Sequence, residues 1–220
     1  MRIISGRLGG RNLKTVEGEG YRPAMGKTRE ALFSMLAARG MDWYSARVLD
    51  LFAGSGSLTF EAISQGKISM DTEVVATETD QAIASIYALS NNKIVAGETY
   101  TVRELLTMTL VPSSNVTTLM LAHLIHDGDD ASFLQLMNDT AQSLGMTNTR
   151  FYNGTGAVFG AFEGYYAPAG SDPSASNEVT AKDMSILAYH LIKKHPDVLE
   201  FTNDTQVTVK AGTPLEETFD

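Results

Sequence analysis

Residues 111–125, VPSSNVTTLMLAHLI, combine a helix break with a long apolar run and decide most of the fold prediction. Pro112 ends the helix-like stretch 101–110, TVRELLTMTL, because proline lacks the backbone N–H that a helix interior needs. A second helix is predicted to begin near Asn115, since Ser and Asn are favoured just before a helix. Two helices joined by a Ser-Ser-Asn turn are therefore expected near the middle of the chain.

Helices and strands are expected on both sides of this pair, so the fold class is mixed α/β. Apolar spacing predicts further helices over 27–39, 58–64, 130–145 and 179–195, the last with Thr180 as N-cap and an end at His195-Pro196. Apolar or alternating runs predict strands at 47–53, 73–77 and 205–212. The stretch 67–100 is expected to be rich in strands, and no closing element is evident at the final residues ETFD.

Composition indicates an ordinary globular chain of 220 residues, with 43% hydrophobic and 20% charged residues. No apolar run approaches the length of about 20 residues that spans a bilayer. Cysteine is absent, which excludes disulfides and thiolate nucleophiles. The N-terminus shows no secretory signal, so the chain as written is expected in the cytoplasm.

The net charge of −9 is unevenly distributed along the chain. The first 66 residues carry 9 Lys+Arg against 6 Asp+Glu, whereas the remainder carries 8 against 20. Such an asymmetry is typical of a basic, nucleic-acid-facing segment beside an acidic one, and it also fits a join between two unrelated segments.

A strand, a tight glycine turn and a helix follow one another in RVLDLFAGSGSLTFEAIS, residues 47–64. Gly54 and Gly56 allow a ligand to approach the backbone, the helix N-terminus offers free N–H groups, and Asp50 supplies a carboxylate. The pattern favours an adenosine-containing ligand. A glycine turn without a ligand is the alternative, because short glycine motifs are weakly specific.

The first third of the chain resembles the bacterial small-subunit ribosomal RNA guanine-N2 methyltransferases. The resemblance lies in residues 1–15, 21–36 and 47–66. It implies that S-adenosylmethionine binds the turn formed by Asp50, Phe52, Ala53, Gly54, Ser55 and Gly56. It also implies that the basic residues of 1–47 face ribosomal RNA. The family's catalytic motif, an acidic or Asn residue followed by Pro-Pro and an aromatic residue, is absent from the sequence.

The cluster Ser113-Ser114-Asn115 fits an N-cap and also the S-x-N element of penicillin-binding serine enzymes. Its surroundings resemble D-alanyl-D-alanine carboxypeptidases, the low-molecular-weight penicillin-binding proteins. That resemblance lies in residues 77–97, 100–125, 144–157, 163–202 and 212–220. It implies an α+β domain that needs no cofactor and takes peptidoglycan peptides or β-lactams. Ser113 would relay a proton, Asn115 would bind the substrate amide, and Asn153 and Gly156 would lie near the site.

That family also needs S-x-x-K, with its nucleophilic serine, and K-T-G. Ser64–Lys67 and Ser90–Lys93 match S-x-x-K formally, but Gly66 and Asn91-Asn92 disfavour the helix it requires. Lys210-Ala211-Gly212 is similar to K-T-G but has alanine in place of threonine. The nucleophile is expected where this chain has its glycine turn.

The sequence therefore predicts a join near 57–66 between a methyltransferase-like segment, 1–66, and a carboxypeptidase-like segment, 67–220. The carboxypeptidase function is favoured but expected to be inactive. The alternatives are a methyltransferase and a recombinant or mis-assembled sequence without catalytic function. The four histidines show no metal-ligand grouping, and His123 and His126 are expected in surface or capping roles.

Overall fold

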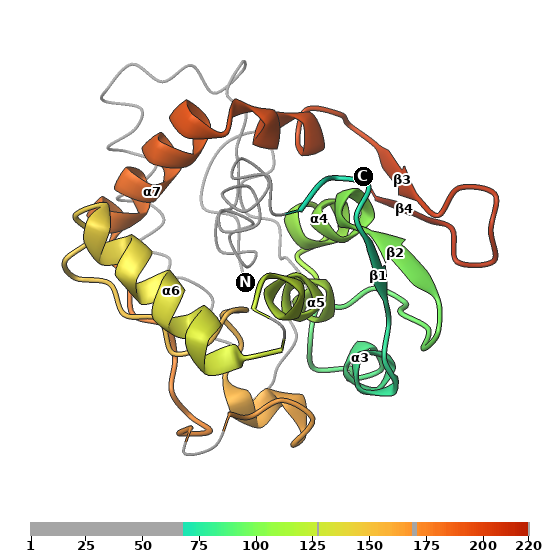
Figure 1. Cartoon of the computed structure of the whole chain (residues 1–220), viewed down its shortest axis with the longest axis horizontal. Coiled ribbons are helices and arrows are strands. Elements are labelled where there is room, and N and C mark those ends of the chain that lie inside the picture. The colour runs from blue at the N-terminus through green and yellow to red at the C-terminus, as the bar shows by residue number, and fades with distance from the viewer. Residues whose placement is uncertain (1–67, 127, 169–170, 220) are drawn as a thin grey trace, which may run out of the picture. The chain divides into compact units, whose positions relative to one another are not determined.

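The computed structural model describes residues 68–126, 128–168 and 171–219. Figure 1 shows the elements in order. They are β1 (Glu73–Val75), α3 (Glu78–Ala84), β2 (Thr99–Thr101), α4 (Val102–Leu110), α5 (Asn115–Ile125), α6 (Asp130–Ser143), the 3-10 helix η1 (Phe159–Phe162), α7 (Ala181–Lys194), the 3-10 helix η2 (Pro196–Phe201), β3 (Val207–Val209) and β4 (Glu217–Phe219). The expected elements at 27–39, 47–53 and 58–64 lie outside the described residues.

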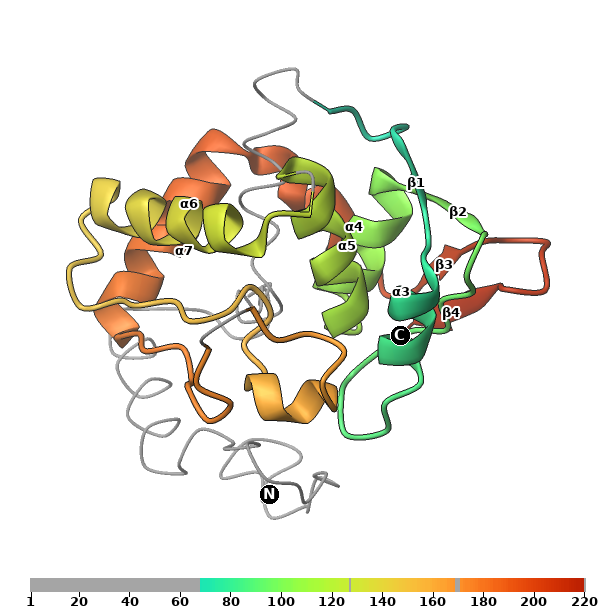
Figure 2. The ribbon, with the colours of Figure 1, turned by 60° about the horizontal axis from the view of Figure 1, so that its bottom comes forward.

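Helices α4 and α5 lie side by side and form the centre of this part of the chain (Figures 1 and 2). Helix α4 begins with a capping box in which the Thr101 hydroxyl accepts from the Glu104 N–H while the Glu104 carboxylate accepts from the Thr101 N–H. Helix α5 is buried without a break from Val116 to Ala122, so it is a core helix rather than an amphipathic surface helix. The predicted pair of helices is confirmed.

Helices α6 and α7 are stabilised by their N-caps and by a shared apolar cluster. Asp129 caps α6 and Thr180 caps α7, each by accepting hydrogen bonds from backbone N–H groups. Ala141, Met146 and Leu187 are buried together between the two helices. The predicted start of α7 after Thr180 and its end before Pro196 are confirmed.

The strands form two small antiparallel ribbons, β1 with β2 and β3 with β4. In the second ribbon Val209 pairs with Glu217 and Thr208 with Thr218. The prediction that no closing element follows 205–212 is wrong, because the last residues return as β4. This pairing joins residues eight to twelve positions apart through backbone contacts, which the polar pattern of the final residues does not reveal.

The sequence prediction also missed helix α3, which lies inside the stretch expected to be rich in strands. Thr77 ends the strand run and becomes the N-cap of α3, where the Asp80 carboxylate accepts from the Thr77 N–H at 2.8 Å. Asp80 is buried and Glu78 lies in the first turn of the helix. The Asp80 carboxylate is therefore used in capping this helix.

Among the helices in the described ranges, none is long and apolar enough to cross a membrane. The same ranges hold no group of three or more His, Cys, Asp or Glu side chains placed to bind a metal ion.

His123 joins α5 to α6, since its Nε2 lies 3.0 Å from Oδ1 of Asp130. The hydrogen bond with Asp130 is the main cause that raises the pKa of His123 above its ordinary value of 6.5, against the opposing effect of burial. Burial, with a smaller contribution from Asp130, likewise raises the pKa of Tyr166.

The His123 shift predicts a small loss of stability as pH rises. A raised pKa means that the folded state binds the proton more tightly, so the added stability is complete below pH 6.5 and is lost as pH rises through the folded-state pKa. The imidazole is 38% exposed, and solvent screening keeps the effect below about 1 kcal/mol. Urea unfolding between pH 6 and 8 should show a steeper decline for the wild type than for His123→Gln. Equal slopes would contradict the expectation.

Candidate active site around Ser113 and Asn115

The S-x-N candidate lies at the break between α4 and α5. Ser113 has a φ of 63°, a left-handed conformation that costs a non-glycine residue about 1–3 kcal/mol and persists only where surrounding contacts hold it. Ser113 is exposed, whereas Ser114 is buried and occupies the N-cap position of α5 without a capping side-chain bond. The Ser114 N–H instead donates to the Met108 carbonyl at 3.0 Å. Of the three residues, Ser114 therefore occupies the N-cap position, but its hydroxyl makes no capping hydrogen bond.

Ser90 supports the two ends of this turn. Its carbonyl accepts from the backbone N–H of Asn115 at 2.8 Å and from the Asn115 side-chain Nδ2 at 2.9 Å. Its hydroxyl donates to the carbonyl of Pro112 at 2.9 Å. These bonds orient the Asn115 amide and leave its Oδ1 without a partner among the described residues. An acceptor of that kind can take a hydrogen bond from the N–H of a peptide.

Asn91 and Asn92 extend this support into the first turn of α5. Asn91 Oδ1 accepts from the Val116 N–H at 3.0 Å, and the Ser114 hydroxyl accepts from the Asn92 N–H at 3.3 Å. Asn91 Nδ2 donates back to Ile83 in α3 at 2.7 Å. The loop 90–92 therefore holds the S-x-N turn in place and connects it to α3.

The same loop contains the formal S-x-x-K match Ser90–Lys93, and its local structure differs from the helix that this motif needs. No helix forms over these residues, so Ser90 and Lys93 do not share a helical face. The Ser90 hydroxyl is used in its bond to Pro112. The other match, Ser64–Lys67, and the cofactor turn of Asp50, Phe52, Ala53, Gly54, Ser55 and Gly56 lie outside the described residues.

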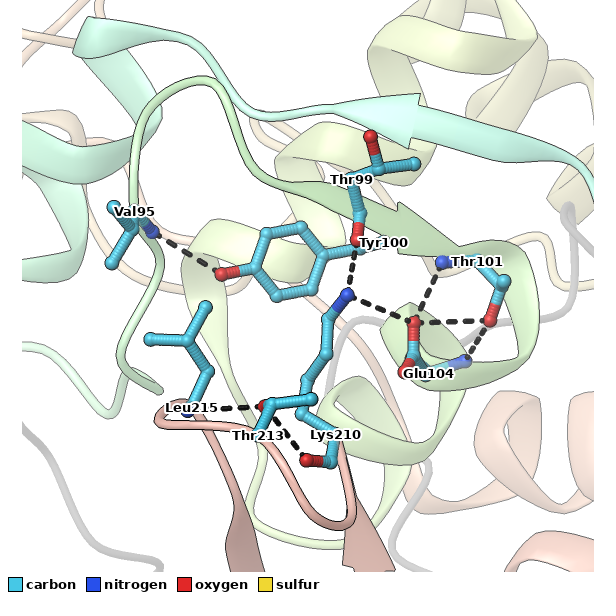
Figure 3. A network of polar contacts seen from close by, with 8 residues as sticks. All are labelled: Val95, Thr99, Tyr100, Thr101, Glu104, Lys210, Thr213 and Leu215. Atoms are coloured by element: carbon cyan, nitrogen blue, oxygen red, sulfur yellow. Dashed lines mark hydrogen bonds and ion pairs between the residues drawn. The ribbon is translucent and has the colours of Figure 1, made fainter.

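Lys210, the lysine of the sequence Lys210-Ala211-Gly212, takes part in a partly buried polar network (Figure 3). Its Nζ donates to the Thr99 carbonyl, lies 3.8 Å from Oε2 of Glu104 and sits 4.6 Å from the centre of the Tyr100 ring. The Tyr100 hydroxyl accepts from the Val95 N–H at 3.2 Å, and burial is the main cause that raises its pKa. Lys210 thus ties the β3–β4 hairpin to β2 and α4.

Asn153 and Gly156 shape a loop of their own. Asn153 is buried, and its Oδ1 accepts from the Gly156 N–H at 2.6 Å and from the Thr155 N–H at 3.2 Å. Gly156 has a φ of 90°, which a side chain would strain. Asn177 holds the loop from outside by accepting from the Asn153 N–H at 3.1 Å. None of these bonds reaches Ser113 or Asn115, so a role of Asn153 and Gly156 at the site stays a prediction.

Sequence inspection found the S-x-N turn but missed the residues that hold it. The loop 90–92 precedes the turn by more than 20 positions, and Glu217, which binds this loop, lies 125 positions beyond Asn92. Neither contact has a local sequence signal. The sequence singles out Ser90 only through its formal S-x-x-K match, which suggests a nucleophile and not a support for the turn.

The fold and the S-x-N turn define the class of penicillin-binding proteins and DD-peptidases. The structure is similar to that of PBP3, described as a peptidoglycan synthesis regulatory factor, from Streptococcus pneumoniae. The TM-score is 0.67 at 31% identity, and the match covers 77% of this chain and 45% of the other. The model of the D-alanyl-D-alanine carboxypeptidase family, Peptidase S11, matches residues 56–218, and the chain belongs to that family.

Two curated relatives cover different parts of the chain. The D-alanyl-D-alanine carboxypeptidase DacF of Bacillus subtilis is 30% identical over 156 residues, 71% of this chain and 35% of its own length. The putative rRNA methyltransferase YlbH of Bacillus subtilis is 48% identical over 66 residues, 30% of this chain and 34% of its own length. The chain thus spans about a third of each relative. Both resemblances predicted from the sequence are confirmed.

Proposed function

We propose that residues 67–220 recognise peptidoglycan-type peptides through the S-x-N turn but do not hydrolyse them. The observation that carries this proposal is the Asn115 side chain, which the Ser90 carbonyl holds at 2.9 Å with its Oδ1 left for a substrate amide. In an active member of the family, a serine attacks the carbonyl carbon before the terminal D-alanine, and water later hydrolyses the acyl-enzyme. Here Ser113 would pass a proton to the leaving amine, and Asn115 would hold the peptide.

The attacking serine is the part that this chain lacks. The sequence offers two S-x-x-K matches, and the serine of one of them, Ser90, donates its hydroxyl to Pro112. The other, Ser64–Lys67, has glycine at the third position, where the motif needs a continuing helix. Without an activated nucleophile no acyl-enzyme forms, however well the peptide is held.

A fluorescent penicillin is therefore expected to leave no covalent label on the full chain. Gel fluorescence after denaturation measures this directly, with DacF as the positive control. A label that survives denaturation and disappears in Ser64→Ala or Ser90→Ala would show that the chain has a working nucleophile and would overturn the proposal of inactivity.

Recognition itself is tested by titrating an acetylated peptide ending in D-Ala-D-Ala while recording NMR shifts of the labelled chain. Shifts are expected at the Asn115 side-chain amide, and Asn115→Ala should weaken binding by about fivefold, the usual value of one neutral hydrogen bond. Asn148→Ala removes an exposed amide that bonds Thr147 and should leave binding intact. The absence of any shift at Asn115 would contradict recognition at this turn.

A second candidate function belongs to residues 1–66, which we propose form a separate methyltransferase-derived segment that binds S-adenosylmethionine. The supporting observation is the 48% identity to YlbH over 66 residues. Asp50, Phe52, Ala53, Gly54, Ser55 and Gly56 would hold the cofactor, and the basic residues of 1–47 would face ribosomal RNA. Methyl transfer is not expected, because the Pro-Pro motif is absent from the sequence.

Calorimetry with S-adenosylmethionine separates this candidate from the first. Binding by the full chain that is lost in Asp50→Ala is expected if the segment keeps its cofactor turn, because the carboxylate supplies a charge-assisted hydrogen bond worth about 1.5–3 kcal/mol. Asp42→Ala serves as a control in the same segment. No heat of binding for the wild type would remove the methyltransferase candidate and leave the peptide-binding proposal unaffected.

A further inference from the structure

Glu217 is a charged residue on the inner face of the β3–β4 hairpin. Its cross-strand partner is Val209, which is buried, and residues that pair across a ribbon project from the same face. The Glu217 carboxylate accepts from Asn92 Nδ2 at 2.8 Å and from the Lys93 N–H at 3.4 Å. The Glu217 carboxylate therefore binds the loop that supports the S-x-N turn.

Asn92 connects this carboxylate to the turn. Its backbone N–H donates to the Ser114 hydroxyl, and the residue is 5% exposed. Its Oδ1 is buried and has no hydrogen-bond partner. A buried acceptor without a partner is unfavourable, but the opposite orientation of the amide would set Oδ1 against the Glu217 carboxylate. Glu217 thus decides how Asn92 is placed.

We propose that Glu217 is a positioning residue for the S-x-N element. It fixes Asn92 and Lys93, and the loop 90–92 in turn holds the amide of Asn115 and the first turn of α5. The β3–β4 hairpin, which Lys210 anchors on β2 and α4, thereby controls a turn about 100 residues earlier in the sequence. An effect of Glu217 on ligand binding rests on the proposed function, whereas its effect on the structure of the S-x-N turn does not.

Native-state hydrogen exchange of the full chain, followed amide by amide by NMR, tests the link. In Glu217→Ala, exchange at Asn115 and Val116 should accelerate about tenfold, because the charge-assisted bond that fixes their supporting loop is lost. The Ser114 amide is the internal reference, since it donates to Met108 in α4 and not to the loop. Its rate should change by less than twofold relative to the wild type.

Glu216→Ala is the matched control. Glu216 accepts from the Gly212 N–H within the hairpin turn at 2.6 Å, so its loss disturbs the hairpin without touching the loop 90–93. Glu217→Gln should restore slow exchange at Asn115 and Val116, because the Gln Oε1 still accepts from Asn92. Asn92→Ala should reproduce the acceleration of Glu217→Ala.

The proposal is overturned if Asn115 and Val116 keep wild-type rates in Glu217→Ala, or if Ser114 accelerates equally. It is also overturned if Glu216→Ala has the same effect. Should Glu217→Ala fail to fold, the decision passes to Asn92→Ala, whose unchanged rates would reject the link. Penicillin labelling plays no part in this experiment, so failure of the proposed function and failure of the positioning role are observed separately.

Discussion

Replacing Asp183 by alanine is expected to lower the free energy of unfolding by about 3 kcal/mol, a large share of the usual 5–15 kcal/mol. Asp183 is 1% exposed, and its Oδ2 accepts from the Asn148 N–H at 2.8 Å and from the Thr149 hydroxyl at 2.9 Å. Alanine leaves these donors without their acceptor and removes an acidic side chain from the first turn of α7, where it favours the helix dipole. Urea denaturation monitored by circular dichroism measures the change.

Two further variants separate the hydrogen bonds of Asp183 from general effects of a lost charge. Asp183→Asn keeps one acceptor of the same shape and should cost less than half as much as Asp183→Ala. Asp139→Ala removes an exposed carboxylate that binds only Gln135 on α6, and it should stay within about 0.5 kcal/mol of the wild type. A loss below 0.5 kcal/mol for Asp183→Ala would contradict the importance of this contact.

Leu119→Ala is expected to cost about 3 kcal/mol, within the range of 2–5 kcal/mol for a large core side chain cut to alanine. Leu119 is fully buried in α5, the helix that begins at the S-x-N turn and packs against α4. The surrounding core cannot close the space, because α5 is buried on all sides from Val116 to Ala122. The same denaturation experiment gives the value.

The control for this variant is Ile192→Ala on α7, where the side chain is 45% exposed. Little apolar surface is lost from the core there, and a change below about 1 kcal/mol is expected. Similar losses for Leu119 and Ile192 would show that α5 is not the centre of the fold.

Local patterns predicted α4, α5, α6 and α7 and the strands β1 and β3, but they missed α3, β2 and β4. Thr180 before an apolar stripe and Pro196 after it mark both ends of α7, since each acts on backbone groups within one turn. Helix α3 was missed because its seven residues lie in a Thr- and Val-rich stretch. Its start depends on the reciprocal bonds of Thr77 and Asp80, which become visible only in three dimensions.

The candidate site divides in the same way. Ser113 and Asn115 were predicted because S-x-N is a contiguous motif, and their role at the site stays a prediction. The residues that support them could not be predicted, since Ser90 and Asn92 contact the turn across 22 positions and Glu217 binds Asn92 across 125. The sequence suggests Ser90 as a formal nucleophile match, whereas in the structure its hydroxyl and carbonyl hold the turn.

The sequence by itself determined the two resemblances, the central pair of helices and the contiguous S-x-N motif. These follow from residue type and spacing, which act over a few residues and are written in the chain. Only the tertiary structure decided that Lys210 is bound within the fold, that the last residues form β4, and that Glu217 reaches the loop under Asn115. Such contacts join segments that are distant in the sequence. These segments come together only when the whole core is buried, so no local pattern predicts the contacts.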